Sequence, residues 1–220
     1  MSTATIRLAV FDCDGTLVDG QADICAAMEA AFSEHGLPAP ERHAIRRIVG
    51  LSLPVAIRNL APEADAALLH AACDSYKLAF RAMREQGQLS EPLFPGIALL
   101  LDHLDTSGWH LGVATGKSDR GLRNVLAVHG LSDRFVTLQT ADRHPSKPHP
   151  AMLDAALAEA CALPGDSVMI GDTTYDIAMA VAAGVRAIGV AWGYHEADEL
   201  FAAGADAVAH TPDELKDLLA

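Results

Sequence analysis

The sequence is poor in basic residues, with 16 Lys and Arg against 29 Asp and Glu, for a formal net charge of −13 at pH 7. A field of this sign repels nucleic-acid backbones and anionic lipid surfaces, which argues against a protein that binds either. The sequence also lacks an uncharged run of the ~18 residues that a membrane span needs, since Arg186 interrupts the longest candidate. An anionic substrate would therefore require locally concentrated cations or a metal ion.

Cysteine is scarce and dispersed. The four residues form no C-x-x-C pair, which excludes a zinc knuckle and a dithiol redox motif; they are Cys13, Cys25, Cys73 and Cys161. We expect all four to be small buried hydrophobic residues in a reducing compartment. The apolar run before Asp12 is too short for a signal peptide, so these features predict a cytoplasmic protein.

Hydrophobic residues make up 50% of the 220 residues, enough to bury a sizeable core. A short apolar run over 6–11, followed by a polar loop that contains glycine, predicts a strand and a tight turn. Apolar residues then follow helical spacing through most of 18–91, with shorter helices expected over 41–49 and 52–61. We therefore predict an all-helical block over 18–91.

From residue 92 onward, predicted strands alternate with helices. The strands are expected at 110–114, 135–138, 167–170, 187–191 and 207–209. Such alternation predicts an α/β fold, a doubly wound Rossmannoid sheet of parallel strands covered on both faces. The core is predicted to comprise residues 1–17 and 92–220, with the helical block 18–91 inserted after the first strand.

Charged residues cluster after the predicted strands. In an open parallel sheet, ligands bind outside the carboxyl ends of the strands. These positions hold four carboxylates and two lysines, together with a threonine and a glycine: Asp12, Asp14, Thr115, Gly116, Lys117, Lys147, Asp172 and Asp176. Carboxylates so crowded repel one another unless a hard cation lies among them, and Mg²⁺ is the simplest choice because it takes oxygen ligands and pairs with substrate phosphate.

Of two common nucleotide-binding motifs, one is absent at the expected place and the other is incomplete. No G-x-G-x-x-G follows the first predicted strand, which argues against a nicotinamide cofactor. The segment Gly116-Lys117-Ser118 has the end of a P-loop, but Leu111 stands where that loop needs its first glycine.

Four segments together carry a resemblance to a known family. They are Asp12-Cys13-Asp14-Gly15-Thr16-Leu17-Val18-Asp19, then Thr115, then Lys147-Pro148, and finally Gly171-Asp172 with Asp176. In this order they resemble the motifs of the haloacid dehalogenase superfamily, and in particular its helical-cap phosphatases of the phosphoglycolate phosphatase type. The resemblance covers nearly the whole chain, and it implies that residues 18–91 form a mobile cap.

The resemblance implies a role for each acidic residue. Asp12 corresponds to the nucleophile that forms an aspartyl-phosphate, and Asp14 to the general acid and base. Mg²⁺ would be held by Asp12, the backbone carbonyl of Asp14, and Asp172, while Asp176 orients the ligands rather than binding the ion.

The same resemblance assigns the phosphate-binding groups. Thr115, the backbone amide of Gly116 and Lys147 would hold the transferring phosphoryl oxygens. Many relatives have Asn where this chain has Gly116, so a side-chain donor is lost. We expect Lys117 to be structural or peripheral.

The substrate is the least determined feature. Cations in the segment 42–51 lead us to expect that Arg47 or Arg46 faces a small anionic leaving group such as glycolate, although a solvated basic helix face explains them equally well. The expected partner is thus a small phosphorylated metabolite, with 2-phosphoglycolate the leading candidate, and the sequence leaves the oligomeric state open. A phosphomutase of the β-phosphoglucomutase kind and a non-catalytic phosphate-binding regulator remain as alternatives.

Overall fold

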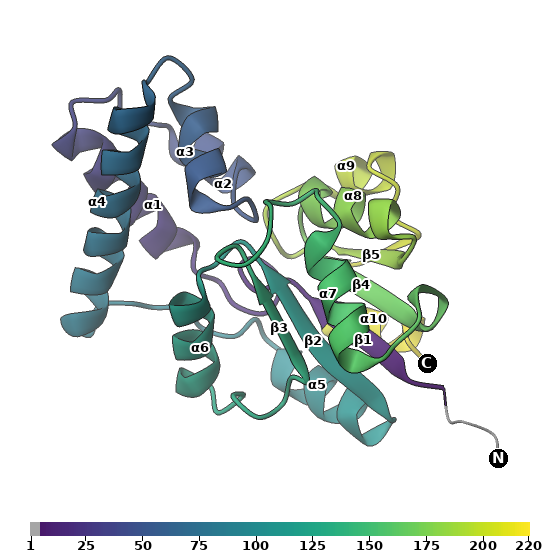
Figure 1. The fold of residues 1–220 in the computed structure, drawn as a ribbon. Helices are drawn as coiled ribbons and strands as arrows, with labels where there is room; N and C mark the ends of the chain where they lie inside the picture. The colour runs from purple at the N-terminus through teal and green to yellow at the C-terminus, as the bar shows by residue number, and fades with distance from the viewer. Residues whose placement is uncertain (1–4) are drawn as a thin grey trace.

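The computed structural model describes residues 5–220, and its centre is a six-stranded parallel sheet (Figure 1). The strands are β1 (Arg7–Phe11), β2 (Trp109–Thr115), β3 (Thr137–Thr140), β4 (Ser167–Gly171), β5 (Arg186–Val190) and β6 (Ala207–Ala209). Their order is β3-β2-β1-β4-β5-β6. The winding reverses between β1 and β4, and in folds of this type the crevice at such a reversal is where ligands bind.

Helices cover both faces of the sheet. One face carries α5 (Ile97–Thr106), α6 (Asp119–Val128) and α10 (Pro212–Leu218); the other carries α7 (Ala151–Ala160), α8 (Thr174–Ala183) and α9 (Ala197–Ala202). Successive strand residues point to opposite faces, so Ala9 and Phe11 of β1 join one apolar cluster while Leu8 and Val10 join the other. The predicted doubly wound α/β fold is confirmed.

Four helices lie between β1 and α5, and we call them the helical insertion. They are α1 (Gln21–Glu34), α2 (Arg42–Arg47), α3 (Leu53–Leu60) and α4 (Ala66–Glu85). Figure 1 shows them gathered to one side of the sheet and its flanking helices. They have an apolar cluster of their own, whose fully buried members include Phe32, Ile45 and Ile57. Two linkers join the helical insertion to the core, one after β1 and one before α5. They run side by side, because the Asp19 amide donates a hydrogen bond to the Pro92 carbonyl at 2.9 Å.

Two local expectations are wrong. The third strand was expected at 135–138 but spans Thr137–Thr140. The strand includes polar Thr137 and Gln139 because both side chains are buried there and donate hydrogen bonds to Glu159. Hydropathy favoured the two apolar residues before the strand, but Phe135 packs into the core from a loop and Val136 is exposed. Cys161 was expected to be buried, but it caps the end of α7 in the left-handed region with φ 54° and is exposed.

In the part of the chain that the structure describes, no helix is long and apolar enough to cross a membrane.

Candidate active site

The carboxyl ends of β1, β2 and β4 bring most of the predicted site residues together. Asp12 and Asp14 follow β1, Thr115 ends β2, and Asp172 follows β4. Asp176 lies in the first turn of α8, and Lys147 comes from the loop before α7. All six of these residues are buried.

Three of the carboxylates form a tight cluster. Oxygen atoms of Asp12, Asp172 and Asp176 all lie within 4.8 Å of one another. Burial raises the pKa of Asp12 to about 7, an effect that Lys147 opposes and the charge of Asp176 reinforces. Burial and the charges of Asp176 and Asp12 likewise raise the pKa of Asp172 well above its usual range. The cluster is therefore unfavourable when fully ionised without a cation.

Asp172 is held in place by donors and by two glycines. Its Oδ1 accepts a hydrogen bond from Thr16 Oγ1 at 2.9 Å, and its Oδ2 accepts one from the Tyr194 amide at 2.9 Å. A Cβ atom added at Gly15 or at Gly193 would lie 2.2 Å from Asp172 atoms. Gly15 also has φ +88°, a backbone conformation that glycine adopts without a steric penalty. Glycine at both positions leaves room for the carboxylate.

Lys147 joins two of the clustered carboxylates. Its Nζ lies 2.6 Å from Asp176 Oδ1 and 2.9 Å from Asp12 Oδ1. The Asp176 Oδ2 accepts from the amide and the hydroxyl of Thr173, which closes a capping box at the start of α8. Both oxygens of Asp176 are thus engaged, which suits a residue that positions Lys147.

The cluster fits a hard divalent cation. Asp12 Oδ1 accepts from the Cys13 amide at 2.7 Å, whereas the buried Asp12 Oδ2 has no hydrogen-bond partner among the described residues. Leaving a buried carboxylate oxygen unpaired is costly. Asp12 and Asp172 therefore offer buried oxygen atoms of the kind that Mg²⁺ binds.

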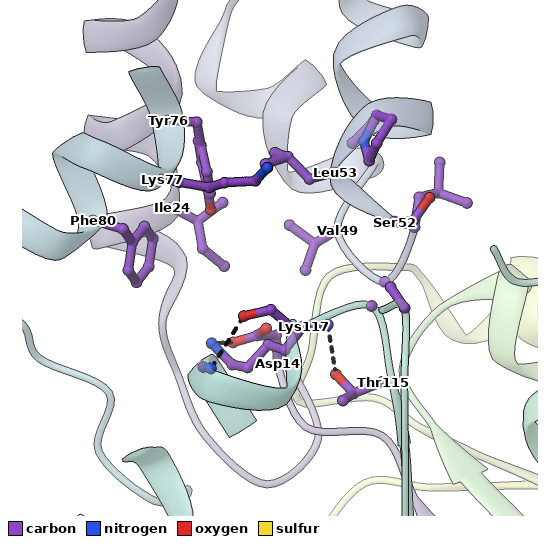
Figure 2. Close-up of a pocket in the computed structure, with 18 of the residues that line it drawn as sticks. Asp14, Ile24, Val49, Ser52, Leu53, Tyr76, Lys77, Phe80, Thr115 and Lys117 are labelled. Atoms are coloured by element: carbon purple, nitrogen blue, oxygen red, sulfur yellow. Dashed lines mark hydrogen bonds and ion pairs between the residues drawn. The ribbon is translucent and has the colours of Figure 1, made fainter. Parts of the chain in front are cut away.

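Asp14 lies in a second charged group with Lys117 and Glu91; Figure 2 shows the Asp14 and Lys117 side chains side by side. Lys117 Nζ is 3.0 Å from Asp14 Oδ1 and 2.6 Å from Glu91 Oε1, and the three side chains are at most 10% exposed. Lys117 was expected to be structural or peripheral, and of these two roles the buried ion pairs fit a structural one: its side chain reaches back from the end of β2 to the carboxyl group after β1. Burial raises the pKa of Asp14, Lys117 lowers it, and Glu91 raises it.

Sequence reasoning missed Glu91 entirely. It lies in the turn-rich linker that leads from the helical insertion into α5, and no motif marks it. The only available signal was a lone acid beside two prolines, which is also common in solvated turns. Its role as a partner for Lys117 becomes visible only once the linker is placed beside β1.

Gly116 lies directly beneath the helical insertion. A Cβ at this position would lie 2.5 Å from the Leu51 carbonyl oxygen and 2.7 Å from that of Gly50. Beside this contact, the Ser52 amide donates to Ser146 Oγ at 2.8 Å. The loop between α2 and α3 therefore covers the end of β2.

A cavity of about 510 Å³ separates the strand ends from the helical insertion. Asp12, Asp14, Thr115, Gly116 and Lys117 line its floor. In Figure 2, apolar side chains from the insertion stand opposite Asp14 and Lys117. These include Ile24, Val49, Leu53, Tyr76 and Phe80.

Neither Arg47 nor Arg46 lines this cavity, although one of the two was expected to face the leaving group. Arg47 forms a two-pronged ion pair with Glu199 of α9, with N to O distances of 2.6 and 2.7 Å. This pairing lowers the pKa of Glu199 to about 2. The Arg47 carbonyl also accepts from Tyr175 Oη at 3.2 Å and lies 3.2 Å from His195 Nε2. The end of α2 is thus fastened to the core, outside the cavity.

Comparisons with known proteins identify the family. A family model described as haloacid dehalogenase-like hydrolase matches residues 9–190, most of the chain. The chain therefore belongs to the haloacid dehalogenase-like hydrolases, as the motifs predicted.

Similar proteins carry several names. The chain is 38% identical over 213 residues to a protein of Dickeya dadantii named probable phosphatase IndB, covering 94% of this chain and 91% of that protein. It is 33% identical to a protein of Mycobacterium tuberculosis named tyrosine-protein kinase PtkA, with 97% and 72% covered. It is 28% identical to a phosphoglycolate phosphatase of Vibrio vulnificus, with 100% and 98% covered. The crystal structure of a predicted phosphatase from Clostridium acetobutylicum superposes with a TM-score of 0.87 at 26% identity, covering 98% and 99% of the two chains.

Proposed function

We propose that this protein is a Mg²⁺-dependent phosphatase that hydrolyses a small phosphate monoester through an aspartyl-phosphate on Asp12. Family membership and relatives named as phosphatases support the enzyme class. The observation that carries the mechanism is the unequal environment of the two Asp12 oxygens. Oδ1 is held by Lys147 and the Cys13 amide, which fixes the carboxylate, while the buried Oδ2 has no hydrogen-bond partner among the described residues.

Asp12 would act as the nucleophile. One of its carboxylate oxygens would form a bond to phosphorus as the bond from phosphorus to the ester oxygen breaks, and the other would be left to the metal ion. A water molecule would then hydrolyse the acyl phosphate. Two in-line displacements replace one difficult attack by water. The hydrogen bond to the Cys13 amide and the contact with Lys147 fix the orientation of the carboxylate during both steps.

Asp14 would move the protons. A raised pKa favours its protonated form, which can donate to the departing alkoxide. The resulting carboxylate would then take a proton from the attacking water. Lys117, 3.0 Å away, stabilises that carboxylate once it forms and so limits how far the pKa rises.

The remaining site residues would bind the phosphoryl group and the metal. Asp12, Asp172 and the backbone carbonyl of Asp14 would hold Mg²⁺, which when bound offsets the repulsion between the carboxylates and the phosphate dianion. Thr115, the Gly116 amide and Lys147 would hold the phosphoryl oxygens. Asp176 would position Lys147 through the 2.6 Å contact.

The test is hydrolysis of para-nitrophenyl phosphate with and without Mg²⁺. We expect release of para-nitrophenol by the native protein with Mg²⁺, its loss in Asp12→Asn, and native activity in Asp154→Asn, whose exposed side chain lies on α7 away from the cavity. Equal turnover by Asp12→Asn would contradict the mechanism. Binding of phosphate without any turnover would favour a regulator.

The substrate and the rival mutase activity need a separate assay. The relatives named phosphoglycolate phosphatase support 2-phosphoglycolate as a candidate, but Arg47 gives it no support because that side chain is paired outside the cavity. A hexose 1-phosphate supplied with a trace of the bisphosphate separates the two reactions. Isomerisation faster than phosphate release would replace the phosphatase by a mutase. A cytoplasmic location stays a prediction.

A further inference from the structure

The cavity above Asp14 is larger than a two-carbon leaving group requires. If each non-hydrogen atom of 2-phosphoglycolate took up as much volume as one water molecule in the liquid, about 30 Å³, the whole molecule would occupy roughly 270 Å³. The cavity measures about 510 Å³. A ligand that filled it would therefore carry a substantially larger alcohol.

The wall opposite the phosphate-binding residues is apolar. Ile24, Val49 and Leu53 line it, together with the rings of Tyr76 and Phe80, whose centroids lie 5.4 Å apart (Figure 2). A carboxylate or hydroxyl placed against these apolar side chains would lose hydrogen bonds to water, and it would find an ionic partner on this side only near Lys77. A hydrocarbon ring placed there would instead gain from burial and from contact with the two aromatic side chains.

Cations lie among the residues that line the same cavity. They are Lys77 and Arg81 of α4, which also pair with Asp74 and Glu85 of the same helix, and Arg84 of α4 and Arg120 of α6. The chain has a formal net charge of −13, so cations at this place give an anionic substrate a locally favourable field. The cavity therefore combines attraction for a phosphate group with an apolar compartment for the alcohol.

From this combination we infer that the substrate class is phosphate monoesters of ring-bearing, largely apolar alcohols, with the ring held against Tyr76 and Phe80. This inference rests on the proposed function and specifies its substrate. The ring-bearing alcohol differs from the small anionic leaving group, such as glycolate, that Arg47 or Arg46 was expected to face.

The test compares esters whose alcohols have similar reactivity, so that leaving-group chemistry does not decide the outcome. Initial rates with Mg²⁺ are measured for benzyl phosphate, ethyl phosphate and 2-phosphoglycolate. Burial of a phenyl ring predicts a kcat/KM for benzyl phosphate that exceeds that for ethyl phosphate by about 30-fold. Equal or higher kcat/KM for 2-phosphoglycolate would overturn the inference.

Variants locate the preference in the cavity. Phe80→Ala and Tyr76→Ala should lower kcat/KM for benzyl phosphate much more than that for ethyl phosphate, and Tyr76→Phe should keep the preference. Phe201→Ala is the matched control, since that ring is half exposed on α9. A preference that survives loss of both rings would contradict the assignment, and retained turnover of ethyl phosphate shows that each variant is folded.

Binding separates this inference from the proposed function. Benzylphosphonate and ethylphosphonate cannot be hydrolysed, so calorimetric titration measures the preference without turnover. Tighter binding of benzylphosphonate with no hydrolysis of any ester would sustain the inference and refute the phosphatase. Equal binding of the two phosphonates would refute the inference even if the esters are hydrolysed.

Discussion

The substitution Asp172→Asn should make the metal-free protein more stable while abolishing activity. Asp172 is fully buried with carboxylate oxygens of Asp12 and Asp176 within 4.8 Å, and within residues 5–220 it forms no ion pair with a cationic side chain. Its two oxygens are stabilised only by the Thr16 hydroxyl and the Tyr194 amide. Asparagine keeps the size of the side chain and removes the charge.

The magnitude follows from the separation of the carboxylates. Two like charges no more than 4.8 Å apart repel by at least about 3.5 kcal/mol at an effective dielectric constant of about 20. The asparagine amide group cannot accept from one of the two donors, which costs about 1 kcal/mol. Allowing for relaxation of the cluster, we expect a net gain of about 2 kcal/mol at pH 8, or roughly 4–8 °C in Tm for a chain of this length.

The pH dependence has a definite sign. Because the pKa of Asp172 is raised in the folded protein, ionising it destabilises the fold, and this cost is present above the raised pKa. The cost diminishes as the pH falls and Asp172 takes up a proton in the folded state. The difference in unfolding free energy between Asp172→Asn and the native protein should therefore shrink between pH 8 and pH 5.

Urea unfolding at pH 8 measures the effect, first with EDTA and then with excess Mg²⁺. An ion bound only by the folded state stabilises the native protein, by about 2.7 kcal/mol at one hundred times its Kd, and should stabilise Asp172→Asn much less. Asp154→Asn controls for loss of a carboxylate at the surface. The reasoning fails if Asp172→Asn is no more stable than the native protein in EDTA, or if both respond equally to Mg²⁺.

Three further predictions test the contacts around the cavity. Gly116→Ala should raise KM on the order of tenfold, because its Cβ collides with backbone carbonyls of the helical insertion, whereas Gly165→Ala has open space and should leave KM unchanged. Arg47→Ala and Glu199→Ala each break the same ion pair and should raise KM for all esters alike, so the double variant should be no worse than either single variant. A change in KM confined to carboxylate-bearing esters would show that Arg47 contacts the substrate. Lys117→Met should lower kcat by about 10- to 100-fold. It should also lower the unfolding free energy more at pH 8 than at pH 5, because the two carboxyls that Lys117 pairs with would then ionise without a cation. Steady-state rates and urea unfolding at both pH values check these two effects.

The arrangement of the acidic cluster could be predicted because sheet topology decides it. The alternation of strands and helices implies parallel strands, and parallel strands place the residues that follow them at one edge. Asp12 and Asp172 meet for this reason, since they follow strands that are neighbours at the reversal of winding. Lys147 is less determined, because it comes from a loop and reaches the cluster through the length of its side chain.

The contacts of Arg47, Lys117 and Glu91 could not be predicted, because they depend on how separate parts of the chain are placed. Helical spacing shows that α2 buries Ile45 but not which part of the core its last turn meets. Glu91 becomes a partner only where the second linker pairs with the segment that follows β1, with Leu93 opposite Val18. Such contacts are few and polar, and no local periodicity encodes them.

The glycine at position 116 shows how a departure from the family pattern can be explained only with the structure in hand. Many relatives have Asn there, and by sequence alone the glycine is simply a lost donor. In the structure, any side chain at 116 would occupy the space of the Leu51 and Gly50 carbonyl oxygens. The backbone amide of Gly116 remains available to a phosphoryl oxygen, while the absence of a Cβ lets the helical insertion rest directly on the end of β2. In the proposed mechanism, this chain would give up a polar side chain at the phosphate site and obtain a closer cover over it, which would help to exclude water from the compartment where Asp14 would transfer its proton.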